Sequence, residues 1–339
     1  MKPRTVAILN DPRLLDARAH HLARLMALYN GQQPDRVIYL NGYNGVGQAD
    51  PYMEPERWVE QALDDLAENA FKLLDPCTFR PLVIEFGPYG VHFIDRMFGA
   101  QVFDLDGTRN WQTHYVNMTV GELNPPDLER DETWALARRV ALAFLDAGVS
   151  APLFGLPTIA STLNIAVNLY GQRILVALLD EPEAARHDLR VINDLLCTLH
   201  RWYLERMPLE QIQPVVGRAR TQPPGYGQLC GCTTQLVSAS QYQTFIAPLD
   251  DQLLSVYPRG GMIHLCGAHT QHIAVWREMR SLRAVQMTDR AVDDLGIYYR
   301  ELREDQILYA NPYDKMPIER ILETTGARRT VVVADAPEP

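Results

Sequence analysis

The sequence has no apolar run long enough to cross a membrane. Its apolar stretches, such as 140–145, stop well short of the roughly 20 residues that a membrane-spanning helix needs. The first ten residues carry charges and no apolar core, which argues against a secretory signal. We therefore expect a protein that does not enter membranes and that resides in the cytoplasm.

Clusters of basic residues are also missing. Lys and Arg total 32 against 42 for Asp and Glu, and the formal net charge is -10. Proteins that hold a phosphate backbone usually concentrate positive charge on one face. We therefore expect a small-molecule substrate and no nucleic-acid partner.

The sequence has few cysteines, and their number is odd. Five cysteines in 339 residues do not suit a secreted disulfide framework, so reduced thiols with chemical or metal-binding roles are the better expectation. Cys77 and Cys197 stand alone on a predicted loop and a predicted helix, and we expect both to be buried packing residues. The remaining three cysteines lie close together in the sequence, so the functional site is sought there.

From residue 81 onward, short apolar runs alternate with amphipathic helical stretches. Strands separated by helices pair in parallel through right-handed crossovers, and about eight strands in about 260 residues fit a closed barrel better than an open sheet. We therefore predict an α/β fold, specifically a TIM-like (β/α)8 barrel. The predicted strands are 82–86, 101–105, 151–154, 227–233, 261–266, 283–287, 306–309 and 330–333.

The beginning of the chain has a different pattern. Apolar stripes at helical spacing occupy 17–29 and 58–74, with a glycine-rich loop at 41–47 between them. We expect residues 1–75 to form an N-terminal helical cap or extension, and residues 76–339 to form one continuous catalytic barrel. In such barrels the side chains at the carboxyl ends of the strands reach the active-site mouth.

Cysteine and histidine residues alternate at two of these strand ends. Cys230 and Cys232 share one face of the first strand, and His264 and Cys266 share one face of the next, because side chains alternate with period two. If both pairs face inward, three thiols and an imidazole meet in one small volume, which is a donor set that zinc prefers. We choose Cys232 as the ligand because it lies nearer the mouth, and expect the deeper Cys230 to be core. The alternative is that all are small buried hydrophobic residues.

The segment Gly261–Gly267 contains His264-Leu-Cys266-Gly, and this resembles the His-x-Cys-Gly motif of the uroporphyrinogen decarboxylase superfamily. The likeness is to the branch of cobalamin-linked methyltransferases that act on thiols. Weaker similarities follow the same order along the chain, at 155–160, 179–183 and 238–248. The resemblance implies a TIM-like barrel and covers about 82–333.

The resemblance also implies a metal site and a methyl donor. In that branch zinc is held by the His and Cys of the motif, here His264 and Cys266, together with a cysteine near the end of the chain. The corresponding stretch 331–336 has no cysteine, so Cys232, Cys230 or Asp335 would have to supply the third ligand. The implied methyl donor is a corrinoid carried by a separate protein.

Three further residues are candidate catalytic groups. Glu85 ends a predicted strand before a Gly-Pro turn, where it would act as a general acid or base, although a carboxylate there could equally cap backbone N–H groups. Asp104 precedes an Asp-Gly pair that is also ordinary turn chemistry. Gln286 ends the strand after His264 and would orient a polar substrate. His269 and His272 follow on the next helix, and we expect them to be surface or capping residues.

Three functions are therefore compatible with the sequence. The leading hypothesis is a zinc-dependent enzyme that deprotonates a thiol and transfers to it a methyl group from a corrinoid. The second is a decarboxylase or other carbon–carbon lyase that acts on a carboxylated substrate. The third is a barrel that binds a corrinoid or tetrapyrrole without catalysis.

Overall fold

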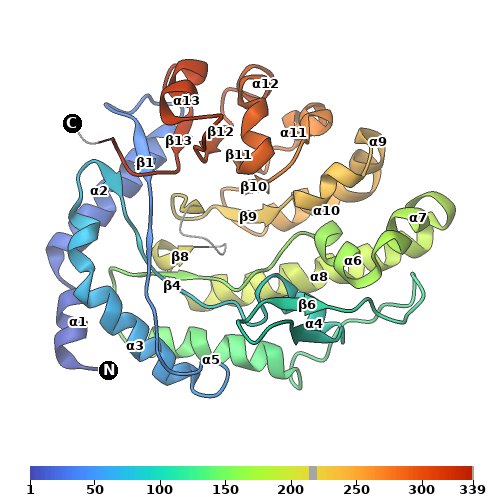
Figure 1. The fold of residues 1–339 in the computed structure, drawn as a ribbon, viewed down its shortest axis with the longest axis horizontal. Helices are drawn as coiled ribbons and strands as arrows, with labels where there is room; N and C mark the ends of the chain where they lie inside the picture. Colours follow the sequence, from blue (N-terminus) through green and yellow to red (C-terminus); the bar gives the residue numbers. More distant parts are fainter. Residues whose placement is uncertain (214–219, 338–339) are drawn as a thin grey trace.

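The computed structural model describes residues 1–213 and 220–337, and it has an α/β fold built on parallel strands (Figure 1). A seven-stranded sheet has the order β3-β1-β13-β12-β11-β10-β9, and a four-stranded sheet has the order β2-β4-β7-β8. The strands of these sheets are β1 (Ile38–Leu40), β2 (Tyr43–Asn44), β3 (Thr78–Phe79), β4 (Leu82–Glu85), β7 (Leu153–Gly155), β8 (Ile212–Gln213), β9 (Gly227–Cys230), β10 (Gly261–Leu265), β11 (Leu282–Met287), β12 (Ile307–Ala310) and β13 (Thr330–Val332).

Two chain segments connect the two sheets. Residues 38–44 contain β1 and β2, and residues 78–85 contain β3 and β4, so each segment contributes to both sheets. Between them the backbone N–H of Asn41 donates to the carbonyl of Phe79 at 3.0 Å and that of Tyr43 to the carbonyl of Pro81 at 2.8 Å. Through these two segments the smaller sheet, whose last strand is β8, continues into the larger sheet, whose last strand is β9. Among the described residues no pairing joins β8 to β9, so the predicted closed (β/α)8 barrel remains a prediction.

The structure corrects two predictions about individual elements. The glycine-rich stretch 41–47, predicted to be a loop, includes β2, and β1 just before it lies between β13 and β3. Residues 1–75 are therefore more than a helical extension, because they contribute strands to both sheets. The predicted barrel strand 101–105 is instead β5 (Val102–Asp104), which pairs antiparallel with β6 (Trp111–Thr113) in a separate hairpin.

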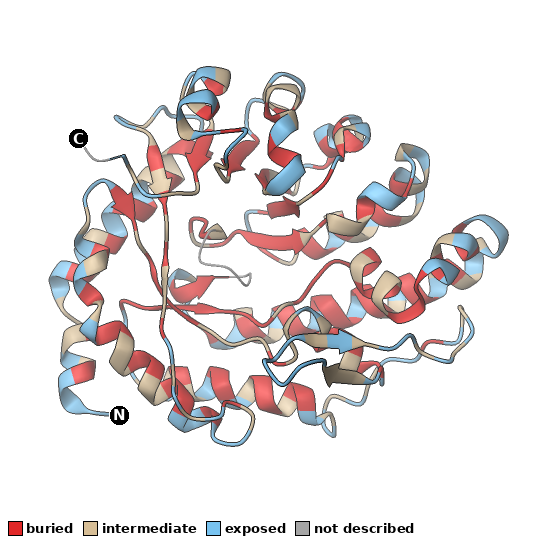
Figure 2. Ribbon diagram, in the orientation of Figure 1, coloured by how far each residue is buried: buried red, intermediate tan, exposed pale blue. Residues whose placement is uncertain are grey.

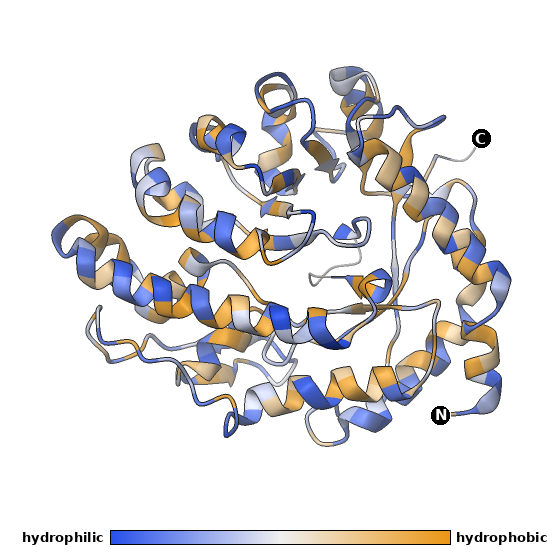
Figure 3. Ribbon diagram, turned by 180° about the vertical axis from the view of Figure 1, so that it is seen from behind, coloured by the Kyte–Doolittle hydropathy of each residue, from blue (hydrophilic) through white to orange (hydrophobic). Residues whose placement is uncertain are grey.

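The helices surround the strands, and their buried sides face them (Figures 1 and 2). A proline stands in the first turn of several helices, among them α1, α2, α3 and α8. The fixed φ of proline suits this position, where the missing N–H is not needed for a helical hydrogen bond. From behind, apolar and polar bands alternate along the long helices (Figure 3). The helices are α1 (Pro3–Leu9), α2 (Pro12–Tyr29), α3 (Pro55–Glu68), α4 (Phe93–Met97), α5 (Glu132–Asp146), α6 (Thr162–Tyr170), α7 (Gln172–Asp180), α8 (Pro182–Arg206), α9 (Ala239–Gln241), α10 (Ala247–Leu254), α11 (Ile273–Glu278), α12 (Leu295–Glu301) and α13 (Ile318–Thr325).

The amphipathic helix α3 shows how the sequence produces this arrangement. Trp58, Ala62 and Leu66 recur every four residues and are buried, because residues at this spacing lie on one face of a helix. Within the described residues, no single helix has the length and apolar composition needed to cross a membrane, and only α6 and α7 taken together, bent by 108°, pass that test. The cytoplasmic location remains a prediction.

Candidate metal centre

Two adjacent parallel strands bring a histidine and two cysteines together. Cys230 at the end of β9 lies in register with His264 on β10, so both side chains point to the same side of the sheet. The sulfur atoms of Cys230 and Cys232 are 3.3 Å apart. One ligand atom each from Cys230, Cys232 and His264 lie within 4.8 Å of one another. We call these three residues the metal-ligand cluster.

A tight turn after β9 explains how two cysteines separated by one residue reach the same place. The strand ends at Cys230, and the backbone N–H of Gly231 donates to the carbonyl of His264 at 2.8 Å. A Cβ atom on Gly231 would lie 2.6 Å from Cδ1 of Ile263, so a larger residue here would have to displace the Ile263 side chain. Cys232 then begins a short 3-10 helix, Cys232–Leu236, which turns its thiol back toward Cys230.

The imidazole of His264 is held in one orientation by its neighbour on β11. Its Nδ1 atom is hydrogen-bonded to Oε1 of Gln286, whose Nε2 donates to Oδ1 of Asn311 at 2.6 Å. Because Oε1 of Gln286 accepts, Nδ1 carries the proton and the lone pair of Nε2 is left for a metal. Burial, together with the positive charge of Arg220, lowers the pKa of His264 to about 3, so the ring is neutral as a metal ligand must be.

Asn164 on α6 is a second supporting residue, and no pattern in the sequence indicates it. Its Nδ2 lies 3.3 Å from the sulfur of Cys230, and its Oδ1 accepts from the hydroxyl of Thr233 at 2.5 Å. Hydrogen bonding from Cys232 lowers the pKa of Cys230 most, and the Asn164 amide adds to the effect. A lowered pKa favours the thiolate, which is the form that binds metal.

Cys266 lies beside the metal-ligand cluster but is not one of the three residues that form it. It follows β10, is half-buried, and is hydrogen-bonded to Cys232. Hydrogen bonds to Cys230 and to Cys266 raise the pKa of Cys232. The metal-ligand cluster therefore contains His264 and Cys232 of the preferred ligand set, and it also contains Cys230, which is half-buried rather than in the core.

Arg220 and Glu85 share the electrostatic environment of the thiols. Burial lowers the pKa of Arg220, and the charges of Cys230, Cys232, Glu85 and Cys266 oppose that shift. Glu85 ends β4 as expected and accepts a hydrogen bond from Nδ2 of Asn44 at 3.3 Å. Arg220 was missed because a single arginine outside any regular pattern gives no signal in the sequence.

Two predicted site residues have structural roles elsewhere. The carboxylate of Asp104 accepts the backbone N–H groups of Gly107 at 3.0 Å and Arg109 at 2.8 Å, so it caps the turn of the β5–β6 hairpin. Asp335 forms an ion pair with Arg80 at 2.7 Å and accepts from Nδ2 of Asn41 at 2.7 Å. The metal-ligand cluster does not include Asp335.

The remaining histidines and cysteines differ in part from expectation. His269 and His272 are completely buried rather than on the surface, and they bond the hydroxyl and the carbonyl of Thr234 at 3.0 and 2.9 Å. They therefore hold the 3-10 helix that begins at Cys232. Cys197 is buried as predicted, whereas Cys77 is exposed.

The donor set fits a zinc ion. In a tetrahedral site with Zn–S bonds of about 2.3 Å, two sulfur ligands lie about 3.8 Å apart. The 3.3 Å between Cys230 and Cys232 is close to that separation, and a neutral, oriented imidazole completes a nitrogen and sulfur set. Three such ligands leave one coordination position open for another group, which is the arrangement of a catalytic site.

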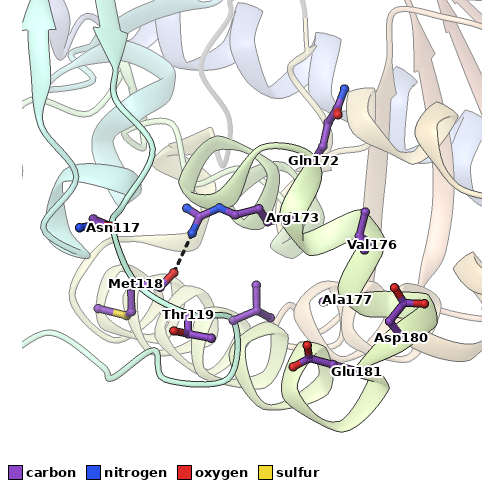
Figure 4. A pocket seen from close by; sticks show the side chains of 10 residues that line it. Asn117, Met118, Thr119, Gln172, Arg173, Val176, Ala177, Asp180 and Glu181 are labelled. Carbon is purple, nitrogen blue, oxygen red and sulfur yellow. Dashed lines mark hydrogen bonds between the residues drawn. The ribbon is translucent and has the colours of Figure 1, made fainter.

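A separate cleft of about 560 Å³ lies between residues 117–120 and helix α7 (Figure 4). The guanidinium of Arg173 crosses it and donates to the carbonyl of Met118 at 2.9 Å. None of the cysteines lines this cleft, so it is distinct from the metal-ligand cluster.

Comparisons with known proteins give a structural likeness. No protein-family model matches the chain, and no curated protein matches its sequence. The fold is similar to that of a methyltransferase from Methanosarcina mazei, with a TM-score of 0.61, 94% of each chain covered and 11% sequence identity. At this identity the likeness concerns the fold alone.

Proposed function

We propose that this protein is a metal-dependent methyltransferase that moves a methyl group from a corrinoid to a thiol-type acceptor. The observation that carries the proposal is the metal-ligand cluster of Cys230, Cys232 and His264 at the carboxyl ends of adjacent parallel strands. Active sites of parallel α/β barrels lie at that end of the strands. The fold likeness to a methyltransferase and the His-x-Cys-Gly motif support the same assignment.

A zinc ion bound there would lower the pKa of an incoming thiol, so that the nucleophilic thiolate forms at neutral pH. The chain's own residues prepare the site for this role. Gln286 fixes the ring of His264, and Asn164 holds the sulfur of Cys230. The cationic Arg220 stands near the thiols and favours negative charge on sulfur.

The proposal also names a methyl donor and a cellular location. A methylated corrinoid on a separate protein is the donor implied by the motif, and the reaction would take place in the cytoplasm. The acceptor is a small molecule that enters the open position beside Cys232.

Methylcobalamin tests the proposal directly. When zinc-loaded protein is mixed with methylcobalamin and each of a panel of small thiols, the methyl group should pass from cobalt to the thiol sulfur. The loss of the methyl–cobalt species is seen as a spectral change. The variants His264→Ala and Cys232→Ser should lose this activity, whereas Cys77→Ser, at an exposed cysteine outside the metal-ligand cluster, should keep it. Thiol binding without discharge would instead support a barrel that binds its ligand without catalysis.

A second candidate function rests on Arg220. A guanidinium beside Glu85 and the cysteines would suit a carboxylated substrate, because arginine binds carboxylates through paired hydrogen bonds. We infer a decarboxylase or lyase as the alternative. Release of carbon dioxide from a carboxylated substrate, with no discharge of methylcobalamin, would favour it.

A further inference from the structure

A buried histidine–aspartate pair lies outside the metal-ligand cluster. Nδ1 of His92 is 2.7 Å from Oδ2 of Asp95, and the same oxygen accepts from Nδ2 of Asn168 at 2.9 Å. Asp95 is completely buried, and its Oδ1 has no hydrogen-bond partner among the described residues. His92 remains partly accessible, with 12% of its side chain exposed.

The pair lies at the same end of the strands as the metal-ligand cluster. His92 ends a short 3-10 helix, Gly90–His92, in the connection that follows Glu85 at the end of β4. Asn168 and Asn164 are four residues apart on α6, so they lie on one face, about 6 Å apart. Asn164 contacts Cys230 and Asn168 contacts Asp95, so one helix face connects the two groups.

The hydrogen bonding leaves His92 ready to accept a proton. Because Nδ1 donates to the carboxylate, Nε2 has a free lone pair, and Asp95 stabilises the imidazolium that forms. Burial raises the pKa of Asp95, while His92 opposes that shift.

A second histidine–aspartate pair in the chain has a different character. His187 lies 3.0 Å from Asp188, but Asp188 also accepts from the N–H groups of Gly121 and Leu123 and from the hydroxyl of Tyr170, at 2.8, 3.1 and 2.7 Å. Both carboxylate oxygens of Asp188 therefore accept hydrogen bonds that hold the loop at Gly121 and Leu123 and the end of α6 in place. This pair is structural and provides a matched control.

We propose that His92 is the general base that takes the proton of the acceptor thiol, with Asp95 as its positioning residue. The inference rests on the proposed function. The S–H bond breaks and its electron pair stays on sulfur, while the proton forms an N–H bond at Nε2 of His92. The imidazolium keeps that proton while the thiolate is bound and returns it to the solvent only after the methylated product leaves.

The experiment uses zinc-loaded full-length protein with 2-mercaptoethanol as the probe. We measure the protons released to the buffer per thiol bound, by calorimetry in two buffers of different ionisation enthalpy, and the rate of methylcobalamin discharge. His92→Gln should release up to one more proton per thiol bound to the buffer than the wild type, because no base in the site takes the thiol proton, and should slow discharge about 10²- to 10⁴-fold. His187→Gln should change neither quantity.

Zinc content and circular dichroism of each variant show whether the site and fold persist. If His92→Gln does not fold, Asp95→Asn, which keeps the side-chain volume, should show the same changes to a smaller degree. Wild-type rate and proton release in variants that keep zinc would overturn the role of His92 while leaving the methyltransferase proposal intact. A wild-type protein that neither binds the thiol nor discharges methylcobalamin would overturn both.

Discussion

Gln286 determines which nitrogen of His264 faces Cys230 and Cys232, because the Gln286 amide is itself held by a hydrogen bond to Asn311. Replacing Gln286 by Leu removes this hydrogen bond and frees the ring to rotate. We expect zinc affinity to fall about 10- to 100-fold, the usual effect of losing a residue that orients a ligand. Competition with a chromophoric chelator measures the change.

Gln228 provides the matched control for that measurement. It lies on β9 two residues before Cys230 and is equally buried, but its amide has no hydrogen-bond partner among the described residues. Gln228→Leu should therefore keep the zinc affinity of the wild type. Equal losses in both variants would show that core packing, rather than the orientation of His264, sets the affinity.

Asp250 should make stability depend on pH. Burial raises its pKa to about 7 from the ordinary 3.8, although Tyr242 donates to its Oδ2 at 2.8 Å. Because the folded pKa is the higher one, the free energy of unfolding should fall as pH rises from about 4 to 7 and stay low above that, by about 4 kcal/mol in total. Urea unfolding at pH 4 and pH 8 measures this fall.

The variant Asp250→Asn cannot titrate and should lose that part of the pH dependence. Asp251→Asn, at the neighbouring half-buried carboxylate, should retain it. A wild-type fall that persists unchanged in Asp250→Asn would assign the dependence to other groups.

At the scale of residues, the sequence predicted which cysteines and which histidine lie together. Period-two alternation placed Cys230 and His264 at adjacent strand ends, but depth along the strand favoured Cys232 over Cys230 as the ligand, because the turn at Gly231 gives no signal in the sequence. Asn164 is distant in sequence from Cys230, and only the packing of α6 on β9 brings them together.

At the scale of elements, the approach of β9 and β10 depends on facing glycines. Gly261 pairs with Gly227, and a Cβ atom on Gly261 would lie 2.2 Å from the carbonyl oxygen of Gly227. Gly261→Ala must push the two strands apart, so we expect a loss of about 1–3 kcal/mol in unfolding free energy. Urea titration measures this loss.

A glycine in a helix gives the corresponding control. Gly296 lies in α12, and a Cβ there would meet only Nη1 of Arg300 at 3.3 Å and Cγ2 of Thr324 at 3.6 Å. Gly296→Ala should therefore leave stability unchanged or raise it slightly, because alanine favours helices. An equal loss in both variants would contradict the role given to the strand contact.

The elements that were predicted correctly are those with enough residues to show a pattern. The apolar runs at 82–86, 261–266 and 283–287 agree with β4, β10 and β11. The short strands β1 and β2 escaped notice because two or three residues show no period. The run 101–105 has the composition of a strand, but its Asp-Gly turn directs it into a hairpin.

At the scale of the whole molecule, alternating strands and helices predicted the α/β class with parallel pairing, and the structure confirms it. Closure into a barrel and the boundary at residue 75 are harder to predict from the sequence. Both depend on pairings between distant segments, such as β1 with β13, that no local pattern encodes. The metal-ligand cluster likewise exists only because β9 and β10 are neighbours in the sheet.

X-ray absorption at the zinc edge, combined with elemental analysis, tests the central claim most directly. Protein purified without chelator should contain about one zinc per chain, with sulfur and nitrogen ligands at about 2.3 and 2.0 Å. Cys230→Ser should lose one sulfur ligand or the metal itself, whereas Cys197→Ser, at a buried cysteine outside the metal-ligand cluster, should match the wild type. A folded protein without metal, or a zinc ion with the same sulfur ligands in Cys230→Ser, would contradict the account.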